Sequence, residues 1–445
     1  MRIVVVGGGI SGLAAAYRLV ERGVDVTVVE QAGRLGGKIR TGEIVGGPVE
    51  LGAEAFAVRD QAGRSSAAIE LASAVGLADS IAYPSIQKAA IAVDGGLLPL
   101  PGGTLMGVPG DLAQLDGVAA ADPGRDHDAG RPVLAEGDIA VGRLVRERLG
   151  DQVADRLVDP MLGGVYAGRA DDLSLATTMP QLAEACRREH TLTGAVRAAL
   201  ASRPASAGPI FGTLVGGMGH LVDAVAARLP APMLGAPVRS IAEQQGRWRL
   251  VVGSTRDPVT LDADGVVLAV PAAPAARLLS DVESLVAYAS VALVTLALPE
   301  VDLPELSGFL VPVDAGYAVK AATFFDRKWA HLRRPGVTVV RASLGRYGDE
   351  QVLQRDDAAL VTLAHLELGR ILGKPLPAPL EARVQRWGGA LPQYPPGHLD
   401  RVAALRAGLP ATIAVAGAAY DGVGIPACIR SGMVAADSVL EGLSA

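Results

Sequence analysis

The N-terminal segment, residues 1–30, constrains the fold more than any other part of the chain. Residues 3–6 are all apolar, a glycine-rich turn follows, and residues 10–20 combine helical apolar spacing with a run of alanines. Gly23 ends this helix, and residues 24–29 form a second, mostly apolar segment. Strand, glycine turn, helix and strand in this order predict a βαβ unit with a parallel sheet and a right-handed crossover.

The turn has the spacing Gly7-x-Gly9-x-x-Gly12, between a strand and a helix, where such a motif binds a dinucleotide. Gly7 permits the tight turn, Gly9 lets the backbone approach a pyrophosphate, and Gly12 allows close helix–sheet packing. The helix N-terminus supplies amide donors and partial positive charge. Glu30 ends the second strand, where its carboxylate would accept hydrogen bonds from ribose hydroxyls. A plain turn is the alternative, and this site alone does not separate NAD from FAD.

A second glycine loop, Arg34-Leu35-Gly36-Gly37-Lys38, follows the ribose acid directly. Its two glycines would let the backbone pass close to a cofactor, and Arg34 and Lys38 would offset phosphate charge. NAD dehydrogenases have no use for such a loop here, so it favours FAD. A solvated loop is the alternative.

Composition narrows the remaining classes. The chain has 445 residues, half of them apolar, which suits two or three domains. A net charge of −6 without a Lys/Arg block argues against nucleic acid as a partner, and the scattered histidines predict no metal site. Cys186 and Cys428 cannot form a disulfide framework, which indicates a reducing cytoplasm. We expect no signal peptide and no membrane span, so any membrane contact would be peripheral.

The rest of the chain predicts an α/β plus α fold class. This is a Rossmann-like FAD-binding domain with an inserted α+β substrate domain and a helix-rich subdomain. Strands are predicted at 248–252, 265–270, 291–298, 337–344 and 412–416, helices throughout 139–201, an exposed loop at 110–132, and a final helix at 426–440. We assign 1–85, 206–280 and 381–445 to the FAD-binding domain, 86–110 and 281–380 to the substrate-binding domain, and 111–205 to the helix-rich subdomain, which would face any membrane.

Several segments match a known family. They are ELGAEAF at 50–56, DPMLGGVYAG at 159–168, FGTLVGGM at 211–218, ADGVVLAVP at 263–271, and, within 416–429, AG and YDGVGIPACI. With the two glycine loops, they make the chain resemble the flavin-containing amine oxidase superfamily. Within it, the chain is similar to the protoporphyrinogen/coproporphyrinogen oxidases, nearly from end to end.

The resemblance implies a role toward FAD for each matching position. The helix that begins near 425 would point its N-terminus at flavin N1–C2=O, where a helix dipole stabilises the negative charge of reduction. Residues 387–397 contain no cysteine of the kind that amine oxidases use to attach their flavin, so FAD should be bound non-covalently. The implied cofactor-binding residues are Gly7, Gly8, Gly9, Ser11, Gly12, Glu30, Gln31, Arg34, Gly37, Lys38, Gly52, Ala53, Glu54, Ala55, Val238, Trp387, Gly417, Val423, Gly424 and Ile425.

The substrate side is implied less directly. Gly164 and Tyr166 would lie against a tetrapyrrole, and Gly308, Phe309 and Leu310 would form its apolar wall, although plain core is the simpler interpretation of that last run. Some relatives bind a substrate carboxylate through an arginine before the hairpin at 93–101. Here Ala89 takes that position with Lys88 beside it, and lysine lacks arginine's bidentate fork. The other cations that could bind propionates are Lys320, Arg341 and Arg346.

The implied reaction is the six-electron oxidation of coproporphyrinogen III to coproporphyrin III, with O2 as acceptor and H2O2 as product. FAD would be the redox centre, and we assign no catalytic side chain. Protoporphyrinogen IX is the alternative substrate. An amine oxidase, a carotenoid desaturase or a non-catalytic FAD-binding protein is a more distant alternative. The expected partners are an anionic tetrapyrrole and O2, for a cytoplasmic monomer or homodimer.

Overall fold

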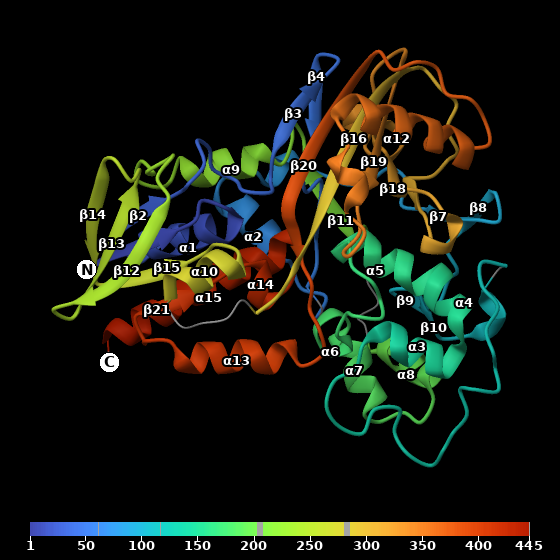
Figure 1. Cartoon of the computed structure of the whole chain (residues 1–445), viewed down its shortest axis with the longest axis horizontal. Helices are drawn as coiled ribbons and strands as arrows, with labels where there is room; N and C mark the ends of the chain where they lie inside the picture. The colour runs from blue at the N-terminus through green and yellow to red at the C-terminus, as the bar shows by residue number, and fades with distance from the viewer. Residues whose placement is uncertain (61, 116, 203–207, 280–284, 445) are drawn as a thin grey trace.

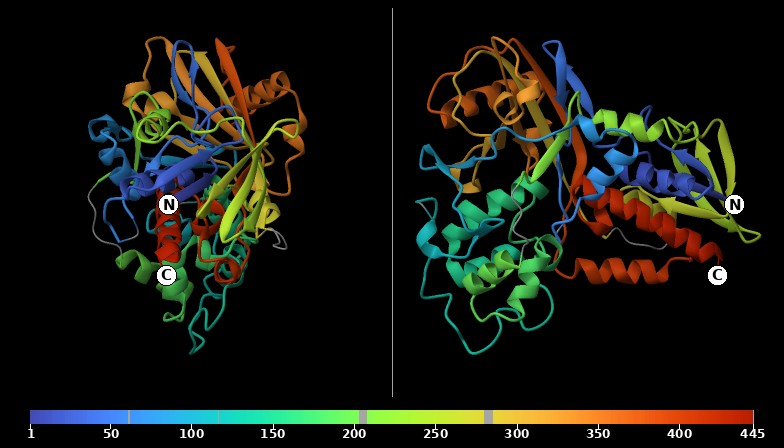
Figure 2. Two further views of the ribbon diagram at one scale, coloured as in Figure 1. Left: turned by 90° about the vertical axis from the view of Figure 1, so that its left-hand side faces the viewer. Right: turned by 180° about the vertical axis from the view of Figure 1, so that it is seen from behind.

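The structure, a computed structural model, describes residues 1–60, 62–115, 117–202, 208–279 and 285–444. It has two unequal halves (Figure 1). One half holds a parallel sheet and both ends of the chain, and the other holds a large, mostly antiparallel sheet above a group of helices. The long strands β16 and β20 run from the antiparallel sheet toward the first half, and the views in Figure 2 show the same arrangement from other sides.

The parallel sheet brings together strands from distant parts of the sequence. Its order is β2-β1-β15-β21, and every neighbouring pair is parallel. The bounds are β1 Arg2–Val6, β2 Asp25–Val29, β15 Gly265–Leu268 and β21 Ile413–Val415. Strand β1 lies in the middle and is almost wholly buried, as expected for a parallel strand covered on both faces.

Two helices from opposite ends of the sequence pack together beside this sheet. Helix α1 is Ile10–Glu21 and helix α15 is Ile425–Ser444. A Cβ added at Gly432 of α15 would overlap the Ser11 carbonyl of α1, so the two backbones are nearly in contact. This approach places the beginning of both helices at one edge of the sheet.

Smaller elements complete this half of the molecule. A three-stranded antiparallel sheet, β12-β13-β14, and a second small sheet, β5-β11-β6, flank the parallel sheet. The bounds are β3 Thr41–Ile44, β4 Gly47–Glu50, β5 Phe56–Ala57, β6 Ile81–Ala82, β11 Phe211–Leu214, β12 Val238–Gln244, β13 Arg247–Gly253, β14 Pro258–Ala263, α2 Ala67–Ala74, α9 Gly219–Ala226, α10 Ala272–Leu279, α13 His398–Gly408 and α14 Ala418–Asp421.

The second half is built on a seven-stranded sheet in the order β20-β16-β19-β18-β17-β7-β8. Helix α12, Asp357–Ile371, packs its Leu360, Ala364 and Leu368 against one face. The other bounds are β7 Ala89–Val93, β8 Gly96–Pro99, β16 Tyr288–Pro299, β17 Gly308–Leu310, β18 Val319–Phe324, β19 Val337–Leu344, β20 Glu381–Pro392 and α11 Phe325–Lys328. Because β20 pairs with β16 along its length, residues 381–392 belong to this sheet, which corrects their assignment to the FAD-binding domain.

A group of helices lies under this sheet. It consists of α3 Val141–Leu149, α4 Asp151–Val153, a π-helical turn Ala154–Val158, α5 Asp159–Tyr166, α6 Leu175–Thr178, α7 Pro180–Cys186 and α8 Leu192–Ala201, with the small strands β9 Thr104–Leu105 and β10 Val108–Pro109 beside them. Helix α5 contacts β17 and β18, so it covers the sheet face opposite α12. None of the helices among the described residues is long and apolar enough to cross a membrane.

Candidate functional site

The two glycine loops form one surface. The Gly36 N–H donates a 2.8 Å hydrogen bond to the Gly8 carbonyl, and Gly9 and Gly36 pair as in a parallel ladder. A Cβ at Gly12 would overlap the Gly7 carbonyl, whereas a Cβ at Gly9 would meet no atom within 4 Å. Gly12 is therefore needed for packing, and Gly9 leaves backbone exposed to open space at the start of α1.

Glu30 lies at this surface. Its carboxylate accepts hydrogen bonds from the Gly8 N–H at 2.6 Å and from the Ala32 N–H at 2.8 Å. Each carboxylate oxygen retains a lone pair for a ribose hydroxyl. The Ala236 N–H donates to the Glu30 carbonyl at 2.9 Å, which brings the segment before Val238 to the same end of the site. Gln31 is exposed at the rim.

The two cations of the second loop differ in what they contact. Arg34 donates to the carbonyls of Leu35 at 2.9 Å and Gly37 at 2.7 Å, so it holds the loop in shape. The expected role of Arg34 toward phosphate charge stays a prediction. Lys38 is accessible to solvent, but protein atoms surround it and their desolvating effect lowers its pKa. This combination is expected for a side chain that lines an interior hollow. Its ammonium lies 5.8 Å from the centre of the Tyr288 ring.

The far end of the hollow is framed by the loop at Gly52 and by the start of α15. A Cβ at Gly52 would overlap the Lys38 carbonyl, and the Trp387 indole N–H donates to the Leu51 carbonyl at 2.7 Å, fixing the ring beside this loop. Gly424, at the start of α15, has φ +109° and has open space where a Cβ would be.

The remaining residues predicted here lie along the same path. Gly417 donates its N–H to Ser431 Oγ at 2.8 Å, and a Cβ there would come 3.6 Å from Ser11 Oγ. Ala53 donates to the Lys38 carbonyl at 3.1 Å. Open backbone at Gly9 and Gly424, a lysine that forms no ion pair with any described carboxylate, and two helix N-termini suit an elongated, anionic dinucleotide, so these residues fit FAD.

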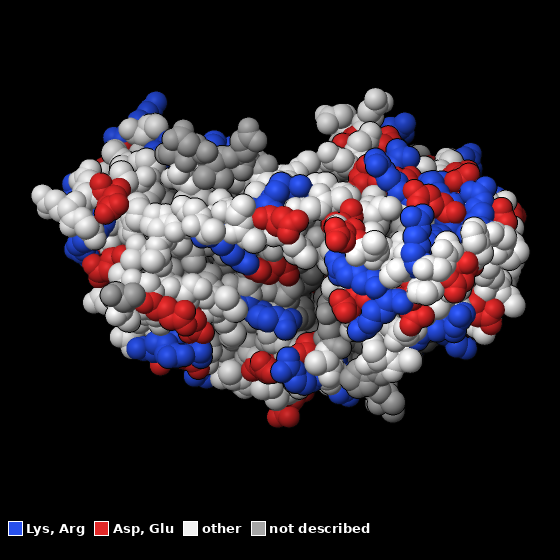
Figure 3. Space-filling view, turned by 90° about the horizontal axis from the view of Figure 1, so that it is seen from below, with Lys and Arg blue, Asp and Glu red and all other residues white. Residues whose placement is uncertain are grey.

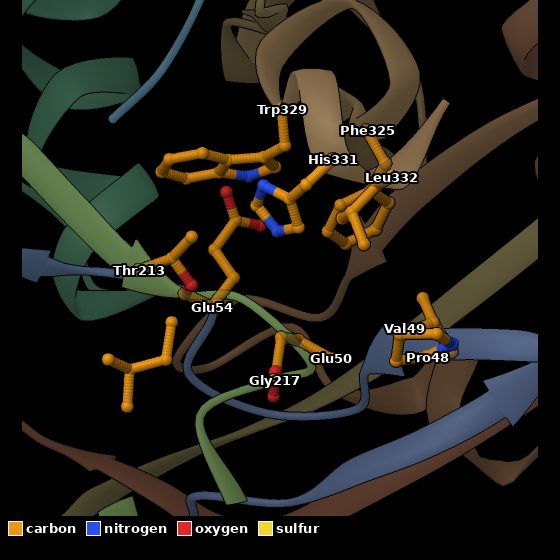
Figure 4. Close-up of a pocket in the computed structure, with 11 residues that line it drawn as sticks. Pro48, Val49, Glu50, Glu54, Thr213, Gly217, Phe325, Trp329, His331 and Leu332 are labelled. Carbon is orange, nitrogen blue, oxygen red and sulfur yellow. The ribbon is translucent and has the colours of Figure 1, made fainter. Parts of the chain in front are cut away.

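Glu54 and Arg341 have a different role from the one predicted. Glu54, labelled in Figure 4, is buried. It forms ion pairs with both Lys328 and Arg341. Burial by itself would raise the pKa of Glu54, but these two charges outweigh it and lower the pKa to about 2. Arg341 also donates to the carbonyls of Glu50 and Gly52. The pair therefore fastens the Gly52 loop to the seven-stranded sheet, which corrects the expectations that Glu54 lines the flavin and Arg341 binds a propionate.

Glu50 is a second buried acid beside this pair. Its Oε1 accepts hydrogen bonds from Thr41 Oγ1 at 3.0 Å and the Met218 N–H at 2.7 Å, while its Oε2 is buried with no partner among the described residues. Burial raises its pKa to about 7. It lines a cavity of about 10 Å³, with Trp329 and His331 on the far side in Figure 4. Such a volume is at the lower limit for one water molecule.

The predicted substrate residues separate into two groups. Gly164, on α5, is exposed, and the one atom within 4 Å of an added Cβ would be Leu310 Cδ2 at 3.2 Å. Its neighbour Val165 is 42% exposed, although it belongs to a helix between two packed layers. Gly164, Val165 and Leu310 therefore face open space and can form one wall of a substrate site.

The other three predicted substrate residues are core. Phe309 is 2% exposed and packs edge-on against Phe324, 5.9 Å away, on the α12 face of the sheet. Gly308 is buried where a Cβ would overlap the Ala322 carbonyl. Tyr166 is buried against Tyr394, and burial raises its pKa to about 12. Their assignment to the substrate wall is corrected because all three are buried. Phe309 also points to the sheet face opposite Leu310, since neighbouring residues of a strand alternate between faces.

Two of the cations predicted to bind propionates form no ion pair with any described carboxylate. Lys88 is exposed and Lys320 is buried. Sequence reasoning missed Lys328 and Tyr288, which touch the predicted site residues Glu54 and Lys38. The positive charge of Lys328 was a weak indication that it could pair with a buried acid. No sequence motif indicated Tyr288. On the face in Figure 3, acidic and basic side chains alternate around a central hollow.

Fold and site together define a dinucleotide-binding flavoprotein, and comparison with known proteins agrees. The chain belongs to the family described as flavin-containing amine oxidoreductases, whose sequence profile matches residues 10–440. It is an oxidoreductase with FAD as its cofactor.

Similar proteins cover the whole chain. Coproporphyrinogen III oxidase of Mycobacterium tuberculosis (strain H37Rv) is 40% identical over 464 residues, 99% of this chain and 98% of that protein. Coproporphyrinogen III oxidase of Bacillus subtilis (strain 168) is 30% identical, covering 98% and 97%. A crystal structure from Exiguobacterium sp. 255-15, provisionally assigned as a protoporphyrinogen oxidase, superposes with a TM-score of 0.85 at 31% identity, covering 99% of both chains.

Proposed function

We propose that this enzyme oxidises coproporphyrinogen III to coproporphyrin III, removing six electrons and six protons while three O2 become three H2O2. The observation that carries the proposal is the wall of Gly164, Val165 and Leu310. It is apolar and borders open space, with Gly164 and Val165 exposed and Leu310 half-buried. Similarity over nearly the full length to curated coproporphyrinogen III oxidases supports the same substrate.

Bound FAD supplies the two-electron acceptor for each of three rounds, and O2 restores it. The chain's own residues position the reactants. Gly9 and the start of α1 would hold the pyrophosphate, Glu30 would hold the ribose, and the N-terminus of α15, at Gly424, would face the flavin ring. The α15 dipole stabilises negative charge there by about 0.3–1 kcal/mol. The wall at Gly164 and Leu310 orients the macrocycle and excludes water from its face.

Anaerobic mixing tests the proposal. Purified holoenzyme is mixed with coproporphyrinogen III, or in a parallel run with protoporphyrinogen IX, and loss of flavin absorbance near 450 nm is followed. We expect faster bleaching by coproporphyrinogen III. Bleaching by neither compound would refute porphyrinogen oxidation, and faster bleaching by protoporphyrinogen IX would favour the alternative substrate.

Three further features belong to the same proposal. Acid precipitation should release all of the flavin into the supernatant, because residues 387–397 offer no cysteine for covalent attachment. The free thiols Cys186 and Cys428 support a cytoplasmic location. Sedimentation would distinguish a monomer from a homodimer.

A further inference from the structure

Lys320 is buried inside the substrate half without a partner for its charge. It lies in β18, at a register shift between Val319 and Ala321 where the pairing with β19 is interrupted. Its exposed fraction is 5%, and its ammonium makes no hydrogen bond or ion pair with any described residue. A bulge of this kind changes the direction of a side chain relative to regular alternation.

A second cation lies near it. Arg346 follows β19 and donates from Nη2 to the Val311 carbonyl at 2.7 Å, and Val311 is itself bonded to the Lys320 carbonyl at 2.9 Å. Burial lowers the pKa of Arg346. The positive charge of Arg346 also lowers the pKa of Lys320, in addition to the larger effect of burial.

The acids nearby do not neutralise this pair. Glu367 of α12 is occupied by the backbone N–H groups of Val319 at 2.8 Å and Ala318 at 3.2 Å. Asp159 of α5 accepts from the Ala170 N–H at 2.8 Å. These two and Asp349 lie close enough to favour the charge of Arg346, but no described carboxylate comes within 4.0 Å of either cation.

The position of the pair relates it to the substrate wall. Ala321, next to Lys320, pairs with Leu310, which packs over Gly164. Asp159 begins the helix that carries Gly164 five positions later, about 7–8 Å along its axis. Lys320 is therefore one residue from the strand pair that carries Leu310, one side of the wall that we assign to the macrocycle.

A buried charge without a counter-ion is costly, and the cost falls when an opposite charge binds. On the basis of the proposed function, we propose that Lys320, assisted by Arg346, is the receptor for a carboxylate of the tetrapyrrole substrate. Lys320 would donate to one carboxylate oxygen, and Arg346 would add long-range attraction from behind it. This assignment makes Lys320 a specificity-determining residue for anionic macrocycles.

The protonation of Lys320 gives an independent readout. Burial lowers its pKa to about 7, so in the free enzyme at pH 8 the amine is mostly neutral. A bound carboxylate favours the charged form and raises this pKa. Binding of a carboxylated porphyrin at pH 8 should therefore take up a proton at Lys320.

The experiment compares wild type with Lys320→Met, Lys320→Arg and the control Lys374→Met. Lys374 lies just after α12, on the other face of the sheet. We expect K320M to raise KM for coproporphyrinogen III at least about tenfold with kcat changed less than about threefold, K320R to recover most of the loss, and K374M to match wild type. Flavin content and circular dichroism confirm that each variant is folded.

Proton uptake is measured separately. Calorimetric titration with the stable product coproporphyrin III, at pH 8 in two buffers of different ionisation enthalpy, gives the protons taken up on binding. We expect wild type to take up more protons than K320M, by as much as one per site. This titration needs no turnover, so it does not depend on the oxidation reaction.

Each outcome separates the two proposals. If wild type oxidises coproporphyrinogen III and K320M has an unchanged KM or equal proton uptake, the receptor role is refuted and the proposed function stands. A fall in kcat alone that arginine does not rescue would make Lys320 a proton acceptor and would likewise refute the receptor role. If neither porphyrinogen bleaches the flavin of wild type, the proposed function is refuted, whatever the K320M variant shows.

Discussion

Two buried charge clusters lie in the substrate half, and they differ in whether their charges cancel. In the first, Glu54 is held by Lys328 and Arg341, which join the flavin loop to the sheet. In the second, Lys320 and Arg346 lie together with no carboxylate within 4.0 Å among the described residues. The first cluster is closed within the protein, and the second lacks a counter-ion.

This difference separates a structural ion pair from a binding site. Both clusters carry strong pKa shifts, so a shifted pKa does not distinguish them. The distinguishing property is the local charge balance. Removing one partner from the closed cluster leaves the other charge buried without a counter-ion, which is destabilising. Removing a cation from the open cluster instead removes an unpaired buried charge, which is stabilising.

The largest expected effect concerns the closed cluster. Glu54→Gln leaves Lys328 and Arg341 without their carboxylate and should lower the free energy of unfolding by about 3–5 kcal/mol. Thermal denaturation of the holoprotein, followed by circular dichroism, measures the loss. Arg249→Met, which breaks the exposed pair with Asp262, is the control and should change the melting temperature little, because solvent screens exposed ion pairs. Equal losses in the two variants would contradict a structural role for Glu54.

The next effect has the opposite sign. Lys320→Met removes an uncompensated cation and should raise the stability of the porphyrin-free enzyme by about 1–4 kcal/mol at pH 7. The pKa of Lys320 is lower in the folded than in the unfolded chain, so wild type gains stability as pH rises from about 7 toward 10.5. The advantage of the methionine variant should therefore shrink over that range. Melting curves at pH 7 and pH 9.5 test this, and a destabilised variant at pH 7 would contradict the missing counter-ion.

The smallest expected change in stability concerns Glu50, which lies beside the closed cluster. The pKa of Glu50 is raised from 4.5 to about 7, so the folded chain holds this proton more tightly and loses stability as pH rises through that window. Glu50→Gln cannot ionise and keeps an oxygen acceptor for Thr41 and Met218. It should match wild type near pH 4.5 and exceed it by about 1–3 kcal/mol at pH 8. A pH-independent difference in melting temperature would show that Glu50 does not titrate in this window.

Sequence reasoning worked where the signal is local. The expected strand at 337–344 is β19, and the expected helix at 426–440 lies within α15, Ile425–Ser444. Glycine spacing also located the surface between the two glycine loops, because each glycine there answers a nearby backbone requirement. These features depend on residues a few positions apart.

It failed where a partner lies far away in the sequence. Glu54 and Lys328 are 274 positions apart, and nothing in either segment identifies the other. Residues 381–392 were assigned to the FAD-binding domain without a predicted strand, and nothing in this segment indicates that it pairs with β16. Likewise, the run Gly308-Phe309-Leu310 does not reveal that Phe309 faces α12 while Leu310 faces α5. Burial and pairing, rather than residue type, decided these positions.

The contact between α1 and α15 also sets an order of events during synthesis. Strand β21 and helix α15 come from residues 413–444, yet they complete the sheet and the helix pair that begin with residues 2–21. A nascent chain that has exposed only its glycine loops has neither the fourth strand nor the second helix start. We therefore expect tight binding of the cofactor only after residues 413–444 have been made. A ribosome-bound chain stalled before residue 413 would carry the best-recognised motif of the protein and still bind no flavin.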